Sequence, residues 1–330
     1  QVKGDARLFG LPVGIEVKGA GKAPALATLS MTLDDAARAR RGIDTGGMLS
    51  GPVGVKVAAS LEGGGDRDFD LDLDFGRASF SDALPGLAKK PGVAARGRAR
   101  VKPEGTGWLL ERMEFDTGPF SARGMLAIAH DGSFLRANLT SLKFAPGDNM
   151  QLEADRAGGV LRLNLKGNSL DARGFIKALQ VGTADKAGGR DAEITLRSTV
   201  LSGFNGELIS NADLKMSMRA GGLRRFDMSG RLDGGLMVAQ LKAGAAGQSA
   251  LVINSADAGA FLRFIDLYNR MRGGTLDLVT QLGAGRQAGN MKVKGFHLRD
   301  EPAIRRLVTD VPNSGGGESA RLDADFVKRM

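Results

Sequence analysis

The sequence predicts a mainly β protein built from antiparallel strands, with a few short helices. The first observation is that apolar residues recur at every second position in many segments, which is typical of strands with one buried face. The second is that glycine-rich turn signals separate these segments at the spacing of antiparallel meanders. The 49 glycines among 330 residues follow no collagen-like period, so they fit many turns.

The clearest alternation lies in the first quarter of the chain. The stretch Asp68 to Phe75 reads DFDLDLDF, which places four carboxylates on one face of a strand and apolar side chains on the other. The run VGVKV shortly before it alternates in the same way. The apolar positions of the two runs are Val53, Val55, Val57, Phe69, Leu71, Leu73 and Phe75.

The same pattern returns in five later segments, which read VLRLNLKG, DLKMSMRA, RRFDMSGRL, TLDLVTQL and NMKVKGFHL. On alternation alone, a closed protein core is favoured over a ligand-binding surface, because packed sheets ordinarily cover each other's apolar faces. The apolar positions of these segments are Leu161, Leu163, Leu165, Leu214, Met216, Met218, Phe226, Met228, Leu276, Leu278, Met291 and Val293.

Three segments are expected to be helical instead. In the strongest, Asp257 is the N-cap, Phe261 and Phe264 belong to a helical apolar stripe, and the helix ends at Arg272 before Gly273-Gly274. The two shorter helical segments are Ser169 to Leu179 and Arg299 to Asp310.

Residues for catalysis or metal binding are scarce. His130 and His297 are the only histidines and lie far apart, and the chain has no cysteine, so neither a metal site nor a nucleophilic triad is predicted. The glycine-rich stretch Gly283 to Gly289 lies between two strand-like runs, which favours a hairpin loop over a phosphate loop. We therefore expect no enzyme activity and no cofactor.

The charges of the chain indicate a solvated surface. Asp68, Asp70, Asp72 and Asp74 would lie about 7 Å apart on one strand face, and we expect them to pair with Lys or Arg of a neighbouring strand rather than to bind Ca²⁺. The net charge of +9 is scattered and aromatic residues make up 5%, so nucleic acid is not an expected partner. The arginines at 224, 225, 305 and 306 favour a solvated basic face over a lipid headgroup contact.

The stretch Ile253 to Val308 resembles the C-terminal region of AsmA-like proteins, which comprise YhdP- and TamB-related bacterial bridge-like lipid-transfer proteins. The similarity lies in an Asp-Ala-Gly start, a short amphipathic helix, a Gly-Gly exit and a hairpin that leads to an acidic-Pro helix. The segment Ser169 to Leu179 and the Pro-Gly segment Asp82 to Val101 also resemble parts of the larger members. The resemblance covers most of residues 80–310.

This resemblance implies a fold and a function beyond what the residues alone give. The fold would be an elongated, twisted antiparallel sheet that forms an open apolar groove with short capping helices, repetitive over residues 1–250 and AsmA-like over 251–330. The apolar positions named above would line the groove, and the function would be non-enzymatic phospholipid transport between inner and outer membrane in outer-membrane biogenesis. The alternative is a β-rich periplasmic scaffold that acts through protein contacts.

The resemblance also implies partners and a location. The partners would be phospholipids, and the inner and outer membrane surfaces or membrane proteins at the groove ends, with the chain as a monomer. The chain opens at Gln1 without an initiator Met, so we expect a fragment or a processed chain. The protein would lie in the periplasm, tethered to the inner membrane by a segment absent from this chain.

Overall fold

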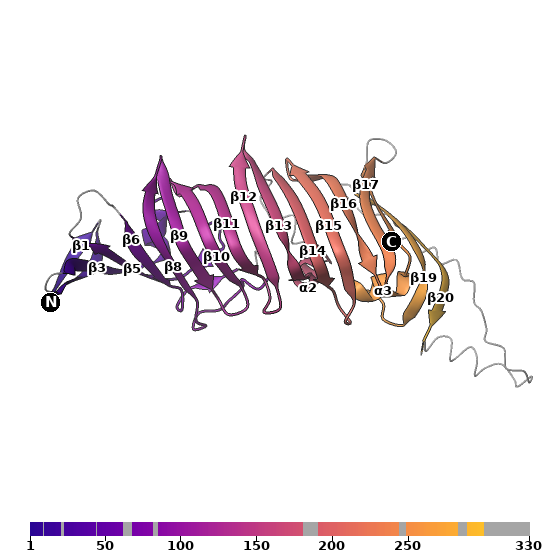
Figure 1. Ribbon diagram of the computed structural model, residues 1–330, viewed down its shortest axis with the longest axis horizontal. Helices are drawn as coiled ribbons and strands as arrows, with labels where there is room; N and C mark the ends of the chain where they lie inside the picture. Colours follow the sequence, from indigo (N-terminus) through magenta and orange to yellow (C-terminus); the bar gives the residue numbers. More distant parts are fainter. Residues whose placement is uncertain are drawn as a thin grey trace, which may run out of the picture. The chain divides into compact units, whose positions relative to one another are not determined.

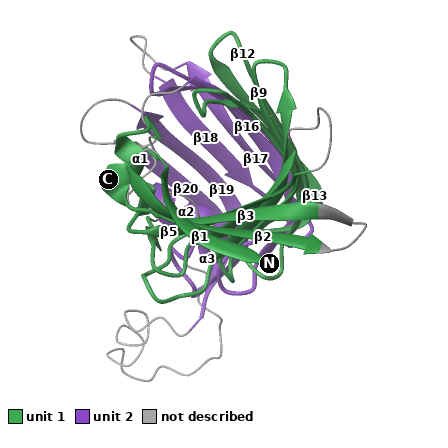
Figure 2. Cartoon of the chain, turned by 90° about the vertical axis from the view of Figure 1, so that its left-hand side faces the viewer, with its two compact units in different colours: residues 1–170 green, residues 171–330 purple. Residues whose placement is uncertain are grey.

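The computed structural model confirms a mainly β fold, with 67% of residues in strands and 8% in helices. It describes residues 1–8, 10–20, 23–43, 45–61, 68–81, 85–180, 191–243, 249–282 and 289–299. Eighteen strands of this part of the chain form twisted β-sheet structure that is not closed on itself (Figure 1). Two further strands form a separate small ribbon. The chain divides into two compact units, residues 1–170 and 171–330 (Figure 2).

In the first unit, each sheet strand pairs antiparallel with the sheet strand that follows it along the chain. Helix α1 (Asp35–Ala39) follows the third strand, and the ribbon consists of β4 (Leu49–Ser50) and β7 (Ser79–Phe80). The sheet strands are β1 (Val2–Leu8), β2 (Leu11–Ala20), β3 (Ala23–Leu33), β5 (Val53–Ser60), β6 (Phe69–Asp74), β8 (Arg96–Glu104), β9 (Gly107–Asp116), β10 (Ser121–Ala129), β11 (Phe134–Lys143), β12 (Asn149–Ala157) and β13 (Val160–Asp171).

The second unit repeats this arrangement with seven strands, again paired antiparallel in chain order. Helix α2 (Arg173–Gln180) precedes the first of them, and helix α3 (Ala258–Phe264) lies between the fifth and the sixth. The strands are β14 (Ala192–Ser202), β15 (Leu208–Arg219), β16 (Gly222–Leu232), β17 (Gly235–Ala243), β18 (Ser249–Ser255), β19 (Met271–Leu282) and β20 (Gly289–Leu298). The regional division expected at residue 250 stays a prediction.

Tight turns hold consecutive strands in register where the sequence indicates them. Gly158-Gly159, Ala220-Gly221 and Asp233-Gly234 each connect two strands and each has two positive φ angles, as a type I′ hairpin turn requires. Ala220 takes a φ of 49°, a conformation that L side chains rarely adopt. The turn therefore depends on its context in the hairpin and not on residue preference alone.

The longest expected helix is shorter than the sequence indicates. Asp257 is its N-cap as predicted, since the Asp257 carboxylate accepts a hydrogen bond of 2.7 Å from the Ala260 amide. The expected end at Arg272 is wrong, because α3 stops at Phe264 and Asp266 takes a left-handed φ of 57°. Gly273-Gly274 lies inside β19, where both residues have positive φ, and does not terminate a helix.

The two shorter helices have different outcomes. Helix α2 confirms that a helix lies near Ser169 to Leu179. The first residues of that expected segment belong to β13, so the helix begins only at Arg173. The expected helix at Arg299 to Asp310 and the glycine-rich stretch from Gly283 lie almost wholly outside the described residues.

Candidate binding surface

The predicted lining residues all lie on one side of their strands and none is exposed. Val53, Phe75, Leu276 and Val293 are buried, and the other fifteen are half-buried. Most residues between them are exposed, for example Asp72, which lies between Leu71 and Leu73, whereas Gly54, Ser217 and Asp227 are half-buried. We call the side that carries the lining residues the apolar face and the opposite side the charged face.

In the first unit the register joins single residues into a continuous apolar row. Residues that pair across strands share one face of the sheet, so each registered pair extends the row by one strand. Two members, Val101 and Ala154, are buried, and the other five are half-buried. The row runs through Phe69, Val101, Leu110, Leu126, Ala137, Ala154 and Leu163.

The second unit has an equivalent row across all seven of its strands. Leu196 and Ala239 are buried, and the other five members are half-buried. The row runs through Leu196, Leu214, Met228, Ala239, Ile253, Leu278 and Met291. Half-buried side chains in the middle of a sheet mean that the rest of the described chain does not fully cover this face.

Some members of the two rows were missed in the sequence. Strand β8 reads RGRARVKPE, where Gly97, Ala99 and Val101 alternate with arginines but the first two are too small to stand out as apolar. Ala137, Ala154 and Ala239 were missed for the same reason. The spacing of the arginines in β8 is the signal that could have revealed its alternation.

One end of the apolar face of the first unit is covered by the protein itself. Phe75 packs with Val53, Ala78 and Ala95, and the ribbon contributes Leu49 and Phe80 to this cluster. Five aromatic rings meet there in edge-to-face or tilted pairs, with centroids 5.2 to 5.9 Å apart. The rings are those of Phe75, Phe80, Phe115, Phe120 and Phe144. We call this the closed end of the unit.

A buried lysine anchors the covering segment. The Lys89 ammonium, 7% exposed, donates hydrogen bonds to the carbonyl oxygens of Phe75, at 2.8 Å, and Ala78. It also lies 5.9 Å from the centroid of the Phe80 ring. Burial lowers the pKa of Lys89, and the nearby Asp74 carboxylate partly opposes this effect. The ammonium thus satisfies carbonyl groups beneath the aromatic cluster.

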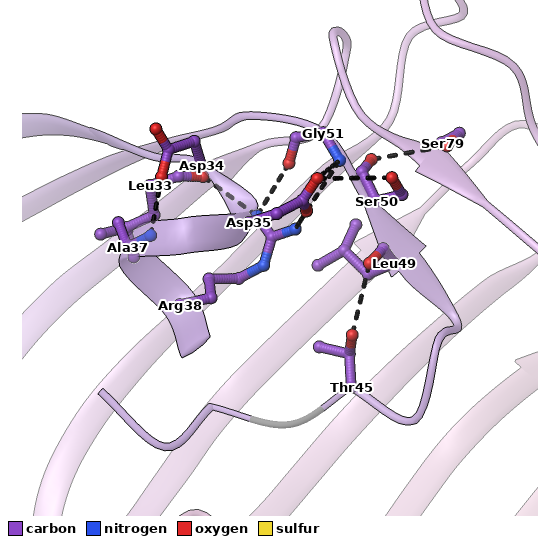
Figure 3. A network of polar contacts seen from close by, with 10 residues as sticks. All are labelled: Leu33, Asp34, Asp35, Ala37, Arg38, Thr45, Leu49, Ser50, Gly51 and Ser79. Carbon is purple, nitrogen blue, oxygen red and sulfur yellow. Dashed lines mark hydrogen bonds and ion pairs between the residues drawn. The ribbon is translucent and has the colours of Figure 1, made fainter. Parts of the chain in front are cut away.

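Helix α1 is fixed beside the same ribbon by the network in Figure 3. The buried Arg38 guanidinium donates to the carbonyl oxygens of Leu33 at 3.0 Å and Gly51 at 2.8 Å, and forms an ion pair with Asp35. The Asp35 carboxylate in turn accepts a hydrogen bond of 3.0 Å from the Gly51 amide. These contacts hold the end of β3 against the start of β5, so the elements at the closed end are fixed to each other by specific hydrogen bonds.

In the second unit helix α3 lies between the end of β18 and the start of β19 and all seven of its residues are buried, so we call these strand ends the closed end of the second unit. A Cβ on Gly259 would lie 2.5 Å from the Met271 carbonyl oxygen, which shows how closely α3 packs on β19. The Arg263 guanidinium forms a 2.5 Å ion pair with Glu207 and donates to the Met271 carbonyl oxygen at 2.5 Å. The complete burial of α3 agrees with a helix that caps the ends of the strands.

Among the residues that the structure describes, no comparable helix or ribbon lies over the opposite strand ends, and we call these the open end. In the first unit Trp108, Ile128 and Phe134 share one registered row there, and all three are half-buried. The Trp108 ring makes edge contacts with Phe69 at 6.0 Å and with His130 at 5.5 Å between centroids. Trp108 is the only tryptophan of the chain, so its fluorescence reports on this end alone.

The charged face is held by ion pairs, as predicted from the aspartate run. Arg98 lies opposite Asp72 and pairs with it at 3.0 Å, and Arg100 pairs with Asp70 at 3.1 Å. Lys102 continues the ladder to Glu111 at 3.0 Å. A hollow of about 780 Å³ lies over these residues, but most of its charged groups bind one another, so we interpret it as a side-chain ladder and not as a ligand site.

Catalytic or metal-binding clusters do not emerge from the described residues. Within them, no group of three or more His, Cys, Asp or Glu side chains could hold a metal ion. His130 and His297 are both exposed and lie in different units. No helix in the described part of the chain has the length and apolar character that a bilayer crossing requires.

Comparisons with known proteins identify no relative of this chain. No family model matches the sequence, no curated protein matches it, and no solved structure matches the fold.

Proposed function

We propose that the apolar face binds the acyl chains of lipids and that the protein is a non-enzymatic lipid carrier. The observation that carries this proposal is the pair of apolar rows, each seven strands long, whose members are mostly half-buried although they lie in the interior of a sheet. Apolar surface of this extent that is left partly accessible to solvent ordinarily marks a binding site.

The chemistry of the rows suits a sliding lipid. Each buried CH₂ group contributes roughly 0.8 kcal/mol, so an acyl chain gains stability wherever it contacts the row. Hydrophobic contacts are not directional, and therefore no specific hydrogen bond has to break when a lipid moves from one strand to the next. Alanine and methionine members, such as Ala239 and Met228, leave an adaptable surface for chains of different shape.

The wider role rests on the resemblance to AsmA-like proteins. In this proposal the lipid is a phospholipid, the route runs between the inner and outer membranes of a bacterial envelope, and the protein works in the periplasm in outer-membrane biogenesis. Membrane surfaces or membrane proteins receive the lipid at the ends of the route.

A periplasmic scaffold is the second candidate, and the closed ends favour it. There the aromatic cluster around Phe75 and the buried helix α3 show that segments of this chain can cover the apolar face themselves. If further protein covers the remaining rows, the surface is a core or a protein interface and takes up no lipid.

Trp108 allows a direct test. The purified protein is incubated with vesicles of phosphatidylglycerol whose acyl chains carry bromine, the vesicles are removed by flotation, and tryptophan fluorescence is measured in the protein fraction. Lipid uptake predicts quenching that persists after flotation and is absent with unbrominated lipid. Unchanged fluorescence, together with no lipid in the protein fraction, would reject the carrier and favour the scaffold.

A further inference from the structure

One arginine departs from the pattern of the apolar face. In strand β12 the apolar-face positions are Met150, Leu152, Ala154 and Arg156, which lie opposite Gly167, Leu165, Leu163 and Leu161 of β13. Arg156 is the only charged residue among the registered apolar-face positions from β8 to β13 in the described residues. It therefore interrupts an otherwise apolar surface at a defined place.

That place is the open end of the unit. Only Ala157 separates Arg156 from the Gly158-Gly159 turn, and the closed end with Met150 lies at the other end of the same strand. Trp108, Ile128 and Phe134 belong to the same end on the neighbouring strands β9, β10 and β11. An acyl chain that lies on the row from Leu163 towards Val101 would have Arg156 next to its entrance.

Arg156 also has no charged partner among the described residues. It is exposed, and it forms no ion pair or side-chain hydrogen bond with any residue that the structure describes. Its strand neighbour Asp155 is on the charged face, where it lies opposite Arg162 and Arg136. The five N–H donors of Arg156 are thus available to an anion at the border between apolar surface and water.

Two explanations of this position can be separated. In the structural explanation, the aliphatic stem of Arg156 covers Leu161 and the guanidinium extends into water, as long cationic side chains do at apolar borders. In the functional explanation, the guanidinium binds an anionic group that is covalently attached to an acyl chain. Charge and position together fit a phosphate-headed lipid, whose tail needs the row and whose head needs a cation at its end.

We propose that Arg156 binds the phosphate of a glycerophospholipid whose acyl chain lies on the apolar row of the first unit. This inference rests on the proposed function, because it assumes that the row takes up acyl chains. It adds a headgroup contact at the open end and predicts that the protein distinguishes phosphate-headed lipids from uncharged lipids with the same tails.

The test uses Trp108 quenching by two lipids with identical brominated chains, phosphatidylglycerol and diacylglycerol, each delivered from cyclodextrin. Arg156→Gln should weaken the binding of phosphatidylglycerol by about two- to five-fold, because an exposed charge pair contributes less than one tenfold step in affinity. The binding of diacylglycerol should be unchanged. Arg156→Lys should restore part of the loss, since the charge is kept and the planar fork is not.

Arg162→Gln is the matched control. It removes the same charge from the same hairpin, but Arg162 lies on the charged face opposite Asp155, so both lipids should bind as they do to the unchanged protein. If Arg156→Gln and Arg162→Gln weaken phosphatidylglycerol equally, the effect is one of net charge and the phosphate contact is refuted. The contact is also refuted if Arg156→Gln weakens both lipids alike, because that pattern is the loss of the apolar stem. If the unchanged protein is quenched by neither lipid, the proposed function itself fails.

Discussion

The ion pair between Arg263 and Glu207 is expected to hold helix α3 on the closed end of the second unit. Its Nε–Oε1 distance is 2.5 Å, and the two side chains are only 10% and 16% exposed. Arg263→Met keeps most of the apolar stem but leaves the Glu207 carboxylate buried without its partner. Because removal of one member of a buried pair is strongly unfavourable, the free energy of unfolding should fall by about 3–5 kcal/mol.

A second pair in the same unit supplies the control. Arg197 and Asp213 also pair through Nε, at 3.0 Å, but their side chains are 67% and 38% exposed. Arg197→Met should therefore lower the free energy of unfolding by less than about 1 kcal/mol. The double variant Arg263→Met with Glu207→Met should recover part of the loss of the single variant, because no charge is then left buried.

Urea unfolding followed by far-ultraviolet circular dichroism measures these differences, and hydrogen exchange of the α3 and β19 amides locates them. We expect faster exchange at α3 in Arg263→Met and unchanged exchange in Arg197→Met. Equal and small effects of the two single variants would refute the reasoning, since burial would then make no difference to the value of the pair.

Three further substitutions test other contacts of the two units. Gly203→Ala places a Cβ 2.3 Å from the Phe264 ring and should lower the free energy of unfolding by about 1–3 kcal/mol, whereas Gly222→Ala, with its nearest atom at 3.6 Å, should have a smaller effect in the same thermal melt. Burial lowers the folded-state pKa of Lys89, so between that pKa and the ordinary value of 10.5 the unfolded chain binds more protons than the folded protein. The stability of the unchanged protein relative to Lys89→Met should therefore rise as pH increases towards 10.5. A stability difference that does not change with pH would contradict this. Asp72→Asn removes an exposed partner of Arg98 and should lower the free energy of unfolding by less than about 1 kcal/mol at low salt, and by less still at 1 M salt. A loss above about 2 kcal/mol in urea titrations would contradict the low value expected of an exposed pair.

Strands whose apolar residues are large could be predicted from the sequence. VLRLNLKG became β13, with Leu161, Leu163 and Leu165 on one face, because each leucine alternates with a polar residue that faces water. The aspartate run predicted basic partners, and β8 supplies them as Arg98 and Arg100. In both cases a local period of two determines which side chains share a face.

Tertiary contacts explain what the sequence could not predict. The helical stripe after Asp257 continues past Phe264, but the backbone turns at Asp266. It is held there by contacts with segments remote in sequence, such as the hydrogen bond from the amide of Phe204, in the turn after β14, to the Phe264 carbonyl oxygen. The role of Lys89 was equally hidden, because it depends on carbonyl groups that only the folded loop brings together. The cation at Arg156 emerged only when the register assigned it to the apolar face.

Photo-crosslinking in cells tests most directly whether the apolar face meets lipid. A photoreactive amino acid replaces Leu163 or Met228 on the apolar rows, and Asn164 or Asp227 next to them on the charged face. Our account predicts lipid adducts at the first two positions and none at the second two. Crosslinks to protein alone at Leu163 and Met228 would contradict it, because the rows would then be a core or a protein interface.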